Sequence, residues 1–178
     1  MSVIDNIKST IGRFYLMRDK AENVQRFTQH WDAVKTVGIL YEATRENMEI
    51  ISKYATKLRN EGKTVYILGY FPYKELTFDV NFTMHSEYIH RQNLTWTGLP
   101  KNDAGMKFKA DDFDLLLNLY NNDILPLFYI SLHSKAKFRI GKFEKINVQF
   151  FDMMIDMKED NIELPDLIKQ IDYYIHKL

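Results

Sequence analysis

The sequence of 178 residues contains no cysteine. This absence excludes thiol catalysis, iron–sulfur clusters, cysteine-ligated zinc and a disulfide framework. Small secreted folds usually depend on disulfides, so a secreted protein of that kind is not expected. Proline and glycine are also sparse, with 4 and 7 residues, and no tract rich in either suggests a linker. We therefore expect one folded unit rather than domains joined by a flexible connection.

Net charge is absent as well, because 24 basic side chains balance 24 acidic ones. A neutral chain has no overall field to hold a polyanion, which argues against general nucleic-acid binding. Apolar stretches such as Leu127–Ile130 are far too short to span a bilayer. Asp5, Lys8 and Arg13 interrupt the amino terminus before the apolar core of a signal peptide can form. These features predict a cytoplasmic protein with no transmembrane segment.

The sequence contains enough apolar side chains to form a core, since 46% of its residues are hydrophobic and 14% are aromatic. Within residues 1–30, Ile7, Ile11 and Phe14 recur at helical spacing, and basic side chains lie largely off their face. We predict an amphipathic helix there, which either covers the sheet or binds a membrane surface or a partner. Because this helix precedes the first strand, residues 31–178 are expected to fold as a single α/β domain without it.

The best-defined unit of the chain is a strand, a helix and a second strand. Thr36–Tyr41 and Thr64–Gly69 are short apolar runs of the kind found in strands buried on both faces. Between them, residues 45–60 carry an apolar stripe at helical spacing. Thr44 is a candidate N-cap for this helix, and Gly62 is a candidate for its C-terminal cap. The unit predicts neighbouring parallel strands joined by a right-handed crossover.

Residues 70–110 show no sustained period, and only Phe78–Phe82 alternates as a half-buried strand would. Beyond them the pattern predicts three more strands and two helices. The strands are expected at Phe113–Leu119, at Ala136–Ile140 (closed by Gly141) and at Val148–Ile155, and the helices at Pro126–His133 and Pro165–Lys177. Alternating strands and helices indicate an α/β protein. We predict a three-layer Rossmann-like fold with a mostly parallel sheet of about five or six strands, preceded by the N-terminal helix.

No glycine-rich phosphate loop follows the first strand, where residues 41–45 read YEATR. A dinucleotide-binding fingerprint needs glycines at this point, so no nucleotide cofactor is predicted. Open sheets nevertheless bind ligands beyond the carboxyl ends of their strands. The side chains expected at that edge, and therefore our candidates for ligand binding, are Glu42, Thr44, Arg45, Tyr70 and Asn118.

Asp111, Asp112 and Asp114 form the densest acidic cluster of the chain. In an extended chain, Asp112 and Asp114 project from one face about 7 Å apart and could share a divalent cation. The alternative is that the first two residues form a turn and that Asp114 bonds nearby backbone. His85 and Glu87 would share a strand face, but the histidines lack metal-binding spacing. Asp114 is kept as a ligand-binding candidate, and no metal site is predicted.

Lys135, Lys137 and Arg139 alternate with apolar residues, so a strand over 135–140 would have one basic face, which Lys142 extends. This patch would suit a phosphate group or a nucleic-acid backbone. The alternative is that the lysines protect an edge strand from aggregation. Both interpretations place the three alternating side chains on the surface. Their exchange for glutamine is then expected to leave thermal stability nearly unchanged.

A resemblance over nearly the whole chain is carried by the succession VGILY, KTVYILGY, FDLLLNL, SKAKFRIG and FFDMMI. It resembles a family of uncharacterised single-domain Bacteroidota proteins, a domain of unknown function, and this implies no activity. A shorter stretch, FDLL followed by Ser134, Ala136 and Arg139–Gly141, is similar to the N-terminal acceptor domain of heptosyltransferase-like glycosyltransferases. Those enzymes bind the sugar nucleotide in a second domain, for which this chain has no room. That similarity implies a half-enzyme relic or a binding module.

The sequence favours a non-enzymatic cytoplasmic binding or adaptor domain, with a protein as its expected partner and no cofactor. One alternative is an enzyme, or a relic of glycosyltransferase type, that acts on a phosphorylated or glycosyl ligand at the strand ends. Another is an RNA- or ribosome-associated factor that uses the basic strand. A concave pocket beside the strand ends, with carboxylates of perturbed pKa, would favour the enzyme.

Overall fold

The computed structural model describes residues 10–12, 14, 30–73, 85–101, 105–120, 124–144, 148, 150–157 and 163–178. Most of the expected N-terminal helix lies outside these residues, although residues 10–12 and 14 are helical. The strand expected at Phe78–Phe82 lies outside them altogether. No helix in this described part of the chain is long and apolar enough to cross a membrane.

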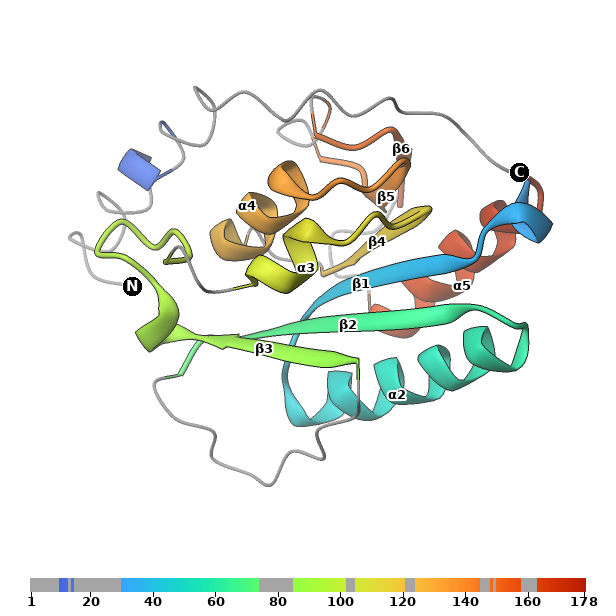
Figure 1. The fold of residues 1–178 in the computed structure, drawn as a ribbon, viewed down its shortest axis with the longest axis horizontal. Helices are drawn as coiled ribbons and strands as arrows, with labels where there is room; N and C mark the ends of the chain where they lie inside the picture. The colour runs from blue at the N-terminus through green and yellow to red at the C-terminus, as the bar shows by residue number, and fades with distance from the viewer. Residues whose placement is uncertain are drawn as a thin grey trace.

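The described residues form a six-stranded sheet in which every neighbouring pair of strands is parallel. The strands lie in the order β3-β2-β1-β4-β5-β6 across the sheet (Figure 1). Their bounds are β1 Thr36–Glu42, β2 Thr64–Phe71, β3 Ser86–His90, β4 Leu115–Leu119, β5 Arg139–Lys142 and β6 Met153–Ile155. The chain thus builds one half of the sheet outward from β1 to β3 and the other half from β4 to β6. This is the strand order of the Rossmann fold, and the predicted fold class is confirmed.

The strand–helix–strand unit at the start of the sheet is also confirmed. β1 and β2 are parallel neighbours, paired in register along the whole of β1, and α2 (Arg45–Asn60) connects them. The Thr44 hydroxyl accepts a hydrogen bond of 3.1 Å from the Asn47 amide and so caps the first turn of α2. Gly62, after the last turn, has a φ of 81°, a left-handed conformation that favours glycine. Local sequence signals therefore fix both ends of this helix.

Helices cover both faces of the sheet (Figure 1). α2 and α5 (Leu164–Ile175) lie on one face, and α3 (Met106–Ala110) and α4 (Leu125–His133) lie on the other. Successive strand residues point to opposite faces, so Ile39 of β1 enters the apolar cluster under α2 and α5, while Leu40 enters the one under α3 and α4. The central strands are buried on both sides, which explains their unbroken apolar runs.

The second half of the sheet differs from the prediction in its strand bounds. β5 begins at Arg139 and continues through Gly141, where a Cβ atom would lie 2.5 Å from a ring carbon of Phe151. Glycine is therefore required inside this strand by close packing and does not end it. β6 covers only the last part of the strand expected at Val148–Ile155. Because β5 pairs with β4 on one side and β6 on the other, the expectation that lysines protect a sheet edge here is wrong.

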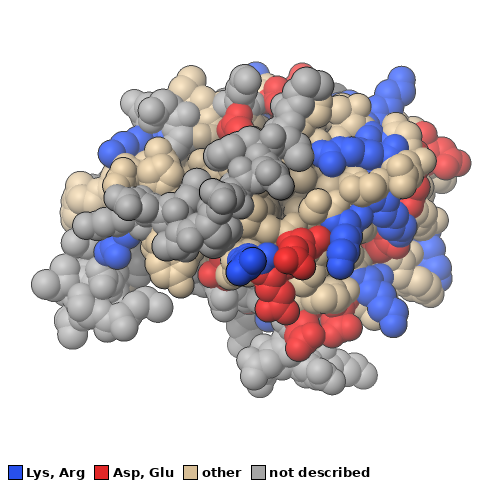
Figure 2. Space-filling model, turned by 90° about the horizontal axis from the view of Figure 1, so that it is seen from below, with Lys and Arg blue, Asp and Glu red and all other residues tan. Residues whose placement is uncertain are grey.

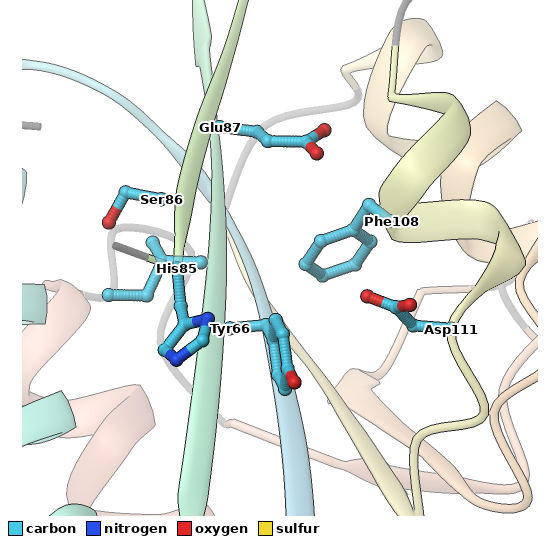
Figure 3. A pocket seen from close by; sticks show the side chains of 7 residues that line it. Tyr66, His85, Ser86, Glu87, Phe108 and Asp111 are labelled. Carbon is cyan, nitrogen blue, oxygen red and sulfur yellow. The ribbon is translucent and has the colours of Figure 1, made fainter. Parts of the chain in front are cut away.

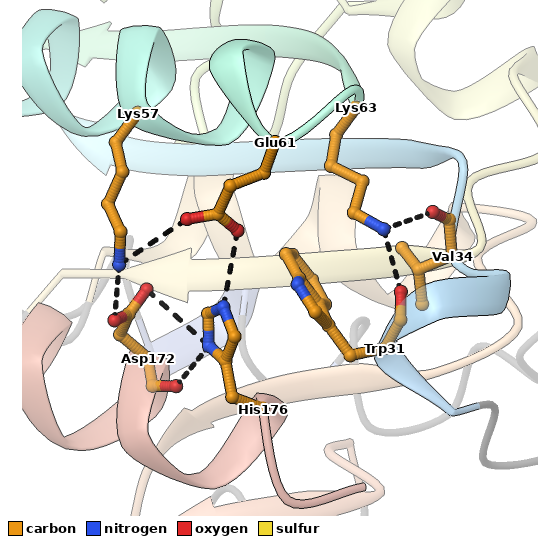
Figure 4. Close-up of polar contacts among 7 residues, drawn as sticks. All are labelled: Trp31, Val34, Lys57, Glu61, Lys63, Asp172 and His176. Atoms are coloured by element: carbon orange, nitrogen blue, oxygen red, sulfur yellow. Dashed lines mark hydrogen bonds and ion pairs between the residues drawn. The ribbon is translucent and has the colours of Figure 1, made fainter.

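Polar contacts join the carboxyl-terminal ends of α2 and α5 (Figure 4). The Lys57 amine lies 3.7 Å from the Glu61 carboxylate and 2.5 Å from that of Asp172. His176 contacts Glu61 through Nε2 at 3.2 Å and the carbonyl of Asp172 through Nδ1 at 2.7 Å. These groups are partly exposed, so each ion pair contributes at most about 1 kcal/mol. Together they hold α5 against α2.

Lys63 holds η1 (Trp31–Ala33) against the turn that follows α2 (Figure 4). Its buried amine donates hydrogen bonds to the carbonyls of Trp31 at 2.7 Å and Val34 at 2.8 Å. The same amine lies 4.3 Å from the centroid of the Trp31 ring. A buried ammonium group loses its hydrogen bonds to water, and the two carbonyl oxygens accept hydrogen bonds in place of that water. The lysine beside Gly62 is thus structural.

Candidate functional site

Glu42, Thr44, Arg45 and Tyr70 lie together where β1 and β2 end. Glu42 and Tyr70 are paired residues of these parallel strands, and Thr44 and Arg45 begin α2 directly after β1. The Thr44 hydroxyl is engaged as the helix cap, and Arg45 is exposed. Burial raises the pKa of Tyr70; the nearby Arg91 opposes this shift, and Glu42 adds to it. The structure therefore brings these four candidates to the carboxyl edge of the sheet, as the sequence predicts.

Asn118 lies inside the sheet, where it is 1% exposed. Its Nδ2 donates a hydrogen bond of 3.1 Å to the carbonyl of Ile140 in β5. Its Oδ1 accepts a hydrogen bond of 3.4 Å from the Tyr120 hydroxyl. Both ends of the amide are therefore bonded within the protein, and one of these bonds joins β4 to β5. This bonding favours a structural role for Asn118 over contact with a ligand.

Asp114 lies at the opposite, amino-terminal edge of the sheet, directly before β4. Its carboxylate accepts hydrogen bonds from the Lys35 amide at 2.8 Å, the Thr36 amide at 3.0 Å and the Lys137 amine at 2.6 Å. Burial alone would raise the pKa of Asp114, but the hydrogen bonds from Lys137 and the two amides hold it below its usual value. Asp114 thus bonds backbone, as the alternative interpretation expects, but the two amides lie 79 and 78 residues away in sequence and not in a local turn. The structure does not bring Asp114 together with the candidates at the strand ends.

The acidic cluster does not form a metal site in the structure. Within the described ranges, no group of three or more His, Cys, Asp or Glu side chains is placed to hold a metal ion. Asp112 is exposed, whereas Asp114 is buried, and β4 begins only at Leu115. The arrangement of Asp112 and Asp114 on one face of a strand is therefore not observed.

The predicted basic face does not form, because Arg139 is only 1% exposed. Lys137 is bonded to Asp114, and the Lys142 amine lies 3.7 Å from the Glu144 carboxylate. Only the chain from Arg139 onward belongs to β5, and helices cover both faces of this part of the sheet. A strand covered on both faces cannot keep one row of side chains in solvent. The prediction of a surface row that includes Arg139 is wrong.

Arg139 instead bonds backbone in the interior. Its guanidinium donates hydrogen bonds to the carbonyls of Phe150 at 3.1 Å, Leu132 at 3.2 Å and Ser134 at 3.5 Å. Leu132 lies in the last turn of α4 and Ser134 directly follows that helix, where carbonyls lack partners within it. A cation at this end also opposes the negative end of the helix dipole. Arg139 thus links α4 to the segment that leads into β6.

Basic and acidic side chains are interspersed on the face that Figure 2 shows. Lys and Arg are more numerous on one side of this view, but Asp and Glu lie among them. α2 contributes both signs, with Glu46 in its first turn and Lys57 and Arg59 in its last. A nucleic-acid backbone needs a surface of one sign, which this face does not provide.

A pocket of about 220 Å³ lies between β3 and α3, beside the first half of β2. The described residues that line it are Tyr66, Ile67, His85, Ser86, Glu87, Phe108 and Asp111. Strand register explains part of this set, because Ile67 and Leu68 of β2 pair with Ser86 and Glu87 of β3. The pocket lies on the α3 and α4 face and away from the strand ends.

Two carboxylates and several rings give this pocket its character (Figure 3). Glu87, on β3, and Asp111, directly after α3, point into the space between these two elements from opposite walls. The Phe108 ring lies between the two carboxylates, and Tyr66 lies below it in the view. The described lining residues include no lysine or arginine. The described lining therefore combines carboxylates with aromatic surface.

The aromatic walls of the pocket are anchored in the core. The Tyr66 ring lies 4.7 Å from the His85 ring and 5.6 Å from the Phe113 ring, measured between centroids. Phe108 is buried and lies 4.7 Å from the same Phe113 ring. Phe113 is itself completely buried. Rings held in this way make a preformed pocket, the usual state of a ligand site.

Sequence reasoning finds parts of this pocket but does not join them. The alternating pattern places His85 and Glu87 on one strand face, and Asp111 belongs to the acidic cluster. Tyr66, however, lies within an apolar strand, and Phe108 lies in a stretch without a period. The short helix α3 brings Phe108 and Asp111 to β3, and no signal in the sequence predicts that helix. The abundance of aromatic residues in this stretch is the one available hint.

The sequence matches a family of unknown function, DUF6913, over residues 8–178. No curated protein and no solved structure matches the chain. The matched region includes every strand of the sheet, the strand-end residues and the pocket. The expectation of an uncharacterised family is confirmed to that extent, while its Bacteroidota source and the similarity to glycosyltransferases remain predictions. Because the match extends over far more than half of its length, the chain belongs to DUF6913, a family of unknown function.

Proposed function

We propose that this protein is a non-enzymatic binding domain that holds its ligand in the pocket between β3 and α3. The observation that carries the proposal is a preformed cavity walled by anchored rings and two carboxylates. Ligand sites are typically concave and mostly apolar, with a few polar groups that converge on the ligand. The described lining shares the concave shape, the rings and the converging polar groups of such a site, with a larger polar share.

The size of the pocket supports a protein as the partner. Its volume of about 220 Å³ lies below the roughly 300–1,000 Å³ of sites for drug-sized ligands. A cavity of this size suits one inserted side chain or a small molecule, but not a whole sugar nucleotide. A cytoplasmic adaptor that accepts one side chain of another protein agrees with this size. The RNA-associated alternative loses its main support, since Arg139 is buried and Lys137 is bonded to Asp114.

The strand order supports a second candidate function. The order of strands reverses between β1 and β4, and open sheets bind ligands beside this switch point. Glu42, Arg45 and Tyr70 lie at the neighbouring strand ends, where an enzyme would act on a phosphorylated or glycosyl ligand. The raised pKa of Tyr70 arises mainly from burial, so it adds little to the case for catalysis. We therefore rank this candidate second.

Nuclear magnetic resonance titration tests both candidates in one experiment. The labelled full-length protein is titrated with a fragment set of small amines, carboxylates, sugars and nucleotides. We expect shifts of the backbone amides of His85, Glu87 and Phe108, with little change at Glu42 and Thr44. Shifts confined to Glu42 and Thr44 would overturn the proposal in favour of the second candidate. A protein that binds no fragment would contradict both.

A further inference from the structure

We infer that His176 makes the junction of α2 and α5 sensitive to pH, because its charged ring closes the junction and its neutral ring loosens it. The junction consists of Lys57, Glu61, Asp172 and His176 (Figure 4). The inference goes beyond the proposed binding function, since α2 and α5 lie on the face of the sheet opposite α3 and the pocket. It is carried by the position of the imidazole ring between oxygen atoms of both helices.

Both ring nitrogens of His176 face atoms that accept hydrogen bonds and donate none. Nδ1 lies 2.7 Å from the backbone carbonyl oxygen of Asp172, and Nε2 lies 3.2 Å from a carboxylate oxygen of Glu61. A neutral imidazole has one N–H group, so it donates one of these bonds and turns a lone pair toward the other oxygen. The imidazolium has two N–H groups and donates both bonds. The geometry of the junction therefore suits the charged ring.

The ion pairs of the junction leave Glu61 to the histidine. The Lys57 amine opposes a positive charge on the ring, but it lies closest to Asp172, at 2.5 Å, and 3.7 Å from Glu61. The Glu61 carboxylate lies closer to Nε2 of His176, at 3.2 Å. The Asp172 carboxylate adds a second negative group 4.0 Å from Nδ1. A charged His176 thus completes the pairing of the two carboxylates.

The helix ends favour the same charge. Glu61 and His176 are the C-cap residues of α2 and α5, so both helices end at the junction. Unpaired carbonyls give this end of a helix a partial negative charge, and a cation there is favourable. The Trp31 ring packs against the His176 ring, with 4.8 Å between their centroids. The ring face of an aromatic residue also attracts a cation.

Three neighbouring titratable groups do not replace the histidine. Burial, and then the nearby Asp172 carboxylate, raise the pKa of Tyr54 well above its usual value, so its hydroxyl stays neutral. The Lys63 amine is directed to two backbone carbonyls. The Lys177 amine donates to the Tyr173 hydroxyl. Histidine ordinarily changes its charge between about pH 5 and 8, where carboxylates and lysines keep theirs. His176 is therefore the group of the junction that responds to pH in this range.

The junction connects the helices that cover the two halves of the sheet. α2 packs against β2, and α5 packs against β4, β5 and β6. When the ring loses its second proton, one of its two hydrogen bonds is lost and a lone pair faces an oxygen. The last turn of α5 should then separate from α2 more often. The fold remains, but the seam between the two helices opens.

The test is amide hydrogen exchange of the full-length protein, followed by nuclear magnetic resonance at about pH 5.5 and about pH 8. Protection factors remove the intrinsic effect of pH on exchange. We expect the protection of the amides of Ile175 and His176 to fall about two- to fivefold as the pH rises, the range that a partly exposed ion pair supports. Amides of β1 should keep their protection. Unchanged protection of Ile175 and His176 would overturn the inference.

Two variants assign the effect to the ring and its partner. The amide introduced by Glu61→Gln can donate as well as accept, so it also satisfies a neutral ring. We expect this variant to lose the pH dependence and to keep the junction closed at both pH values. His176→Gln removes the titrating ring and should also abolish the dependence. His30→Gln is the matched control, because His30 is exposed and lies outside the junction, and it should retain the dependence.

Thermal melting verifies that each variant is folded, and the two variants test the inference separately if one of them is not. A pH dependence that persists in His176→Gln would place the titrating group elsewhere and overturn the inference. Persistence in Glu61→Gln would show that the Glu61 carboxylate is not the partner of the charged ring, and it would overturn the inference as well. Loss of the dependence in His30→Gln would assign it to His30 instead.

Discussion

Asp114 joins segments that are distant in sequence. Its carboxylate accepts bonds from the amides of Lys35 and Thr36, which lead into β1, and from Lys137, which precedes β5. Hydrogen bonds to a charged group contribute about 1.5–3 kcal/mol each. Asp114→Asn keeps the shape and removes the charge, so we expect the free energy of unfolding at neutral pH to fall by about 2 kcal/mol. Urea denaturation measures this change, and Asp112→Asn at the neighbouring exposed position serves as its control.

The lowered pKa of Asp114 predicts that the loss of stability in Asp114→Asn depends on pH. Because the pKa of folded Asp114 is lowered, its charge favours the folded state above the unfolded-state pKa of about 4. This contribution is lost as the pH falls through the lower pKa of the folded protein. The stability difference between the wild type and Asp114→Asn should be complete at neutral pH and shrink below about pH 4. A difference that stays constant down to acidic pH would show that the charge of Asp114 is not its cause.

At the scale of elements, Arg139 links the end of α4 to the segment before β6. Arg139→Met would leave the carbonyls of Leu132 and Phe150 buried without their donor, at a cost of about 1–3 kcal/mol each. We expect the free energy of unfolding, measured in urea, to fall by about 3 kcal/mol or more. Lys135→Met, at an exposed position, should change it by no more than about 0.5 kcal/mol. Equal stability of the two variants would contradict the proposed link.

The buried position of Arg139 also reverses an expectation from the sequence about thermal stability. Exchange of Lys135, Lys137 and Arg139 for glutamine is expected from the sequence to leave thermal stability nearly unchanged. Since Arg139 is buried and Lys137 is bonded to Asp114, the triple exchange should lower it. The alternating pattern is compatible with both a solvated basic face and a buried arginine. Only the position of β5 between two other strands distinguishes them.

At the scale of the whole molecule, the N-terminal segment touches the sheet domain at Gly12. A Cβ atom there would lie 2.6 Å from the carbonyl oxygen of Thr97 and 2.7 Å from a methyl carbon of Leu125. Among the described residues, however, the members of both apolar clusters lie from Trp31 onward. We therefore predict that deletion of residues 1–30 leaves a cooperative thermal transition at a lower melting temperature. Calorimetry tests this, and a product without a cooperative transition would contradict it.

Much of the fold follows from the sequence because its signals are local. The apolar runs of β1 and β2, the cap at Thr44 and the turn at Gly62 are each specified within a few residues. The order of the strands, by contrast, depends on pairings such as Val37 with Leu115, which are far apart in the chain. No local pattern encodes such a pairing. A parallel α/β sheet was therefore predictable, and the bounds of β5 and β6 were not.

The candidate sites were predictable to different degrees for the same reason. Glu42, Thr44, Arg45 and Tyr70 follow two recognisable strands, so topology alone brings them together. Asn118 belongs to a recognisable strand too, but its bonds to Ile140 and Tyr120 depend on the neighbouring strand and on packing. The pocket requires α3, a helix of five residues in a stretch with no period. Tertiary packing creates this site, and the sequence pattern does not show it.

The late position of α5 in the chain has a consequence for synthesis on the ribosome. α5 contacts β4, β5 and β6 on the face that it shares with α2, and it follows all three strands in sequence. Translation delivers about 5–20 residues per second and lets earlier segments begin to fold first. In the half formed by β1, α2 and β2, the helix can cover one apolar face of the two strands as it emerges. The other half leaves an apolar face open until α5 has left the exit tunnel, and this interval is when the nascent chain most needs a chaperone.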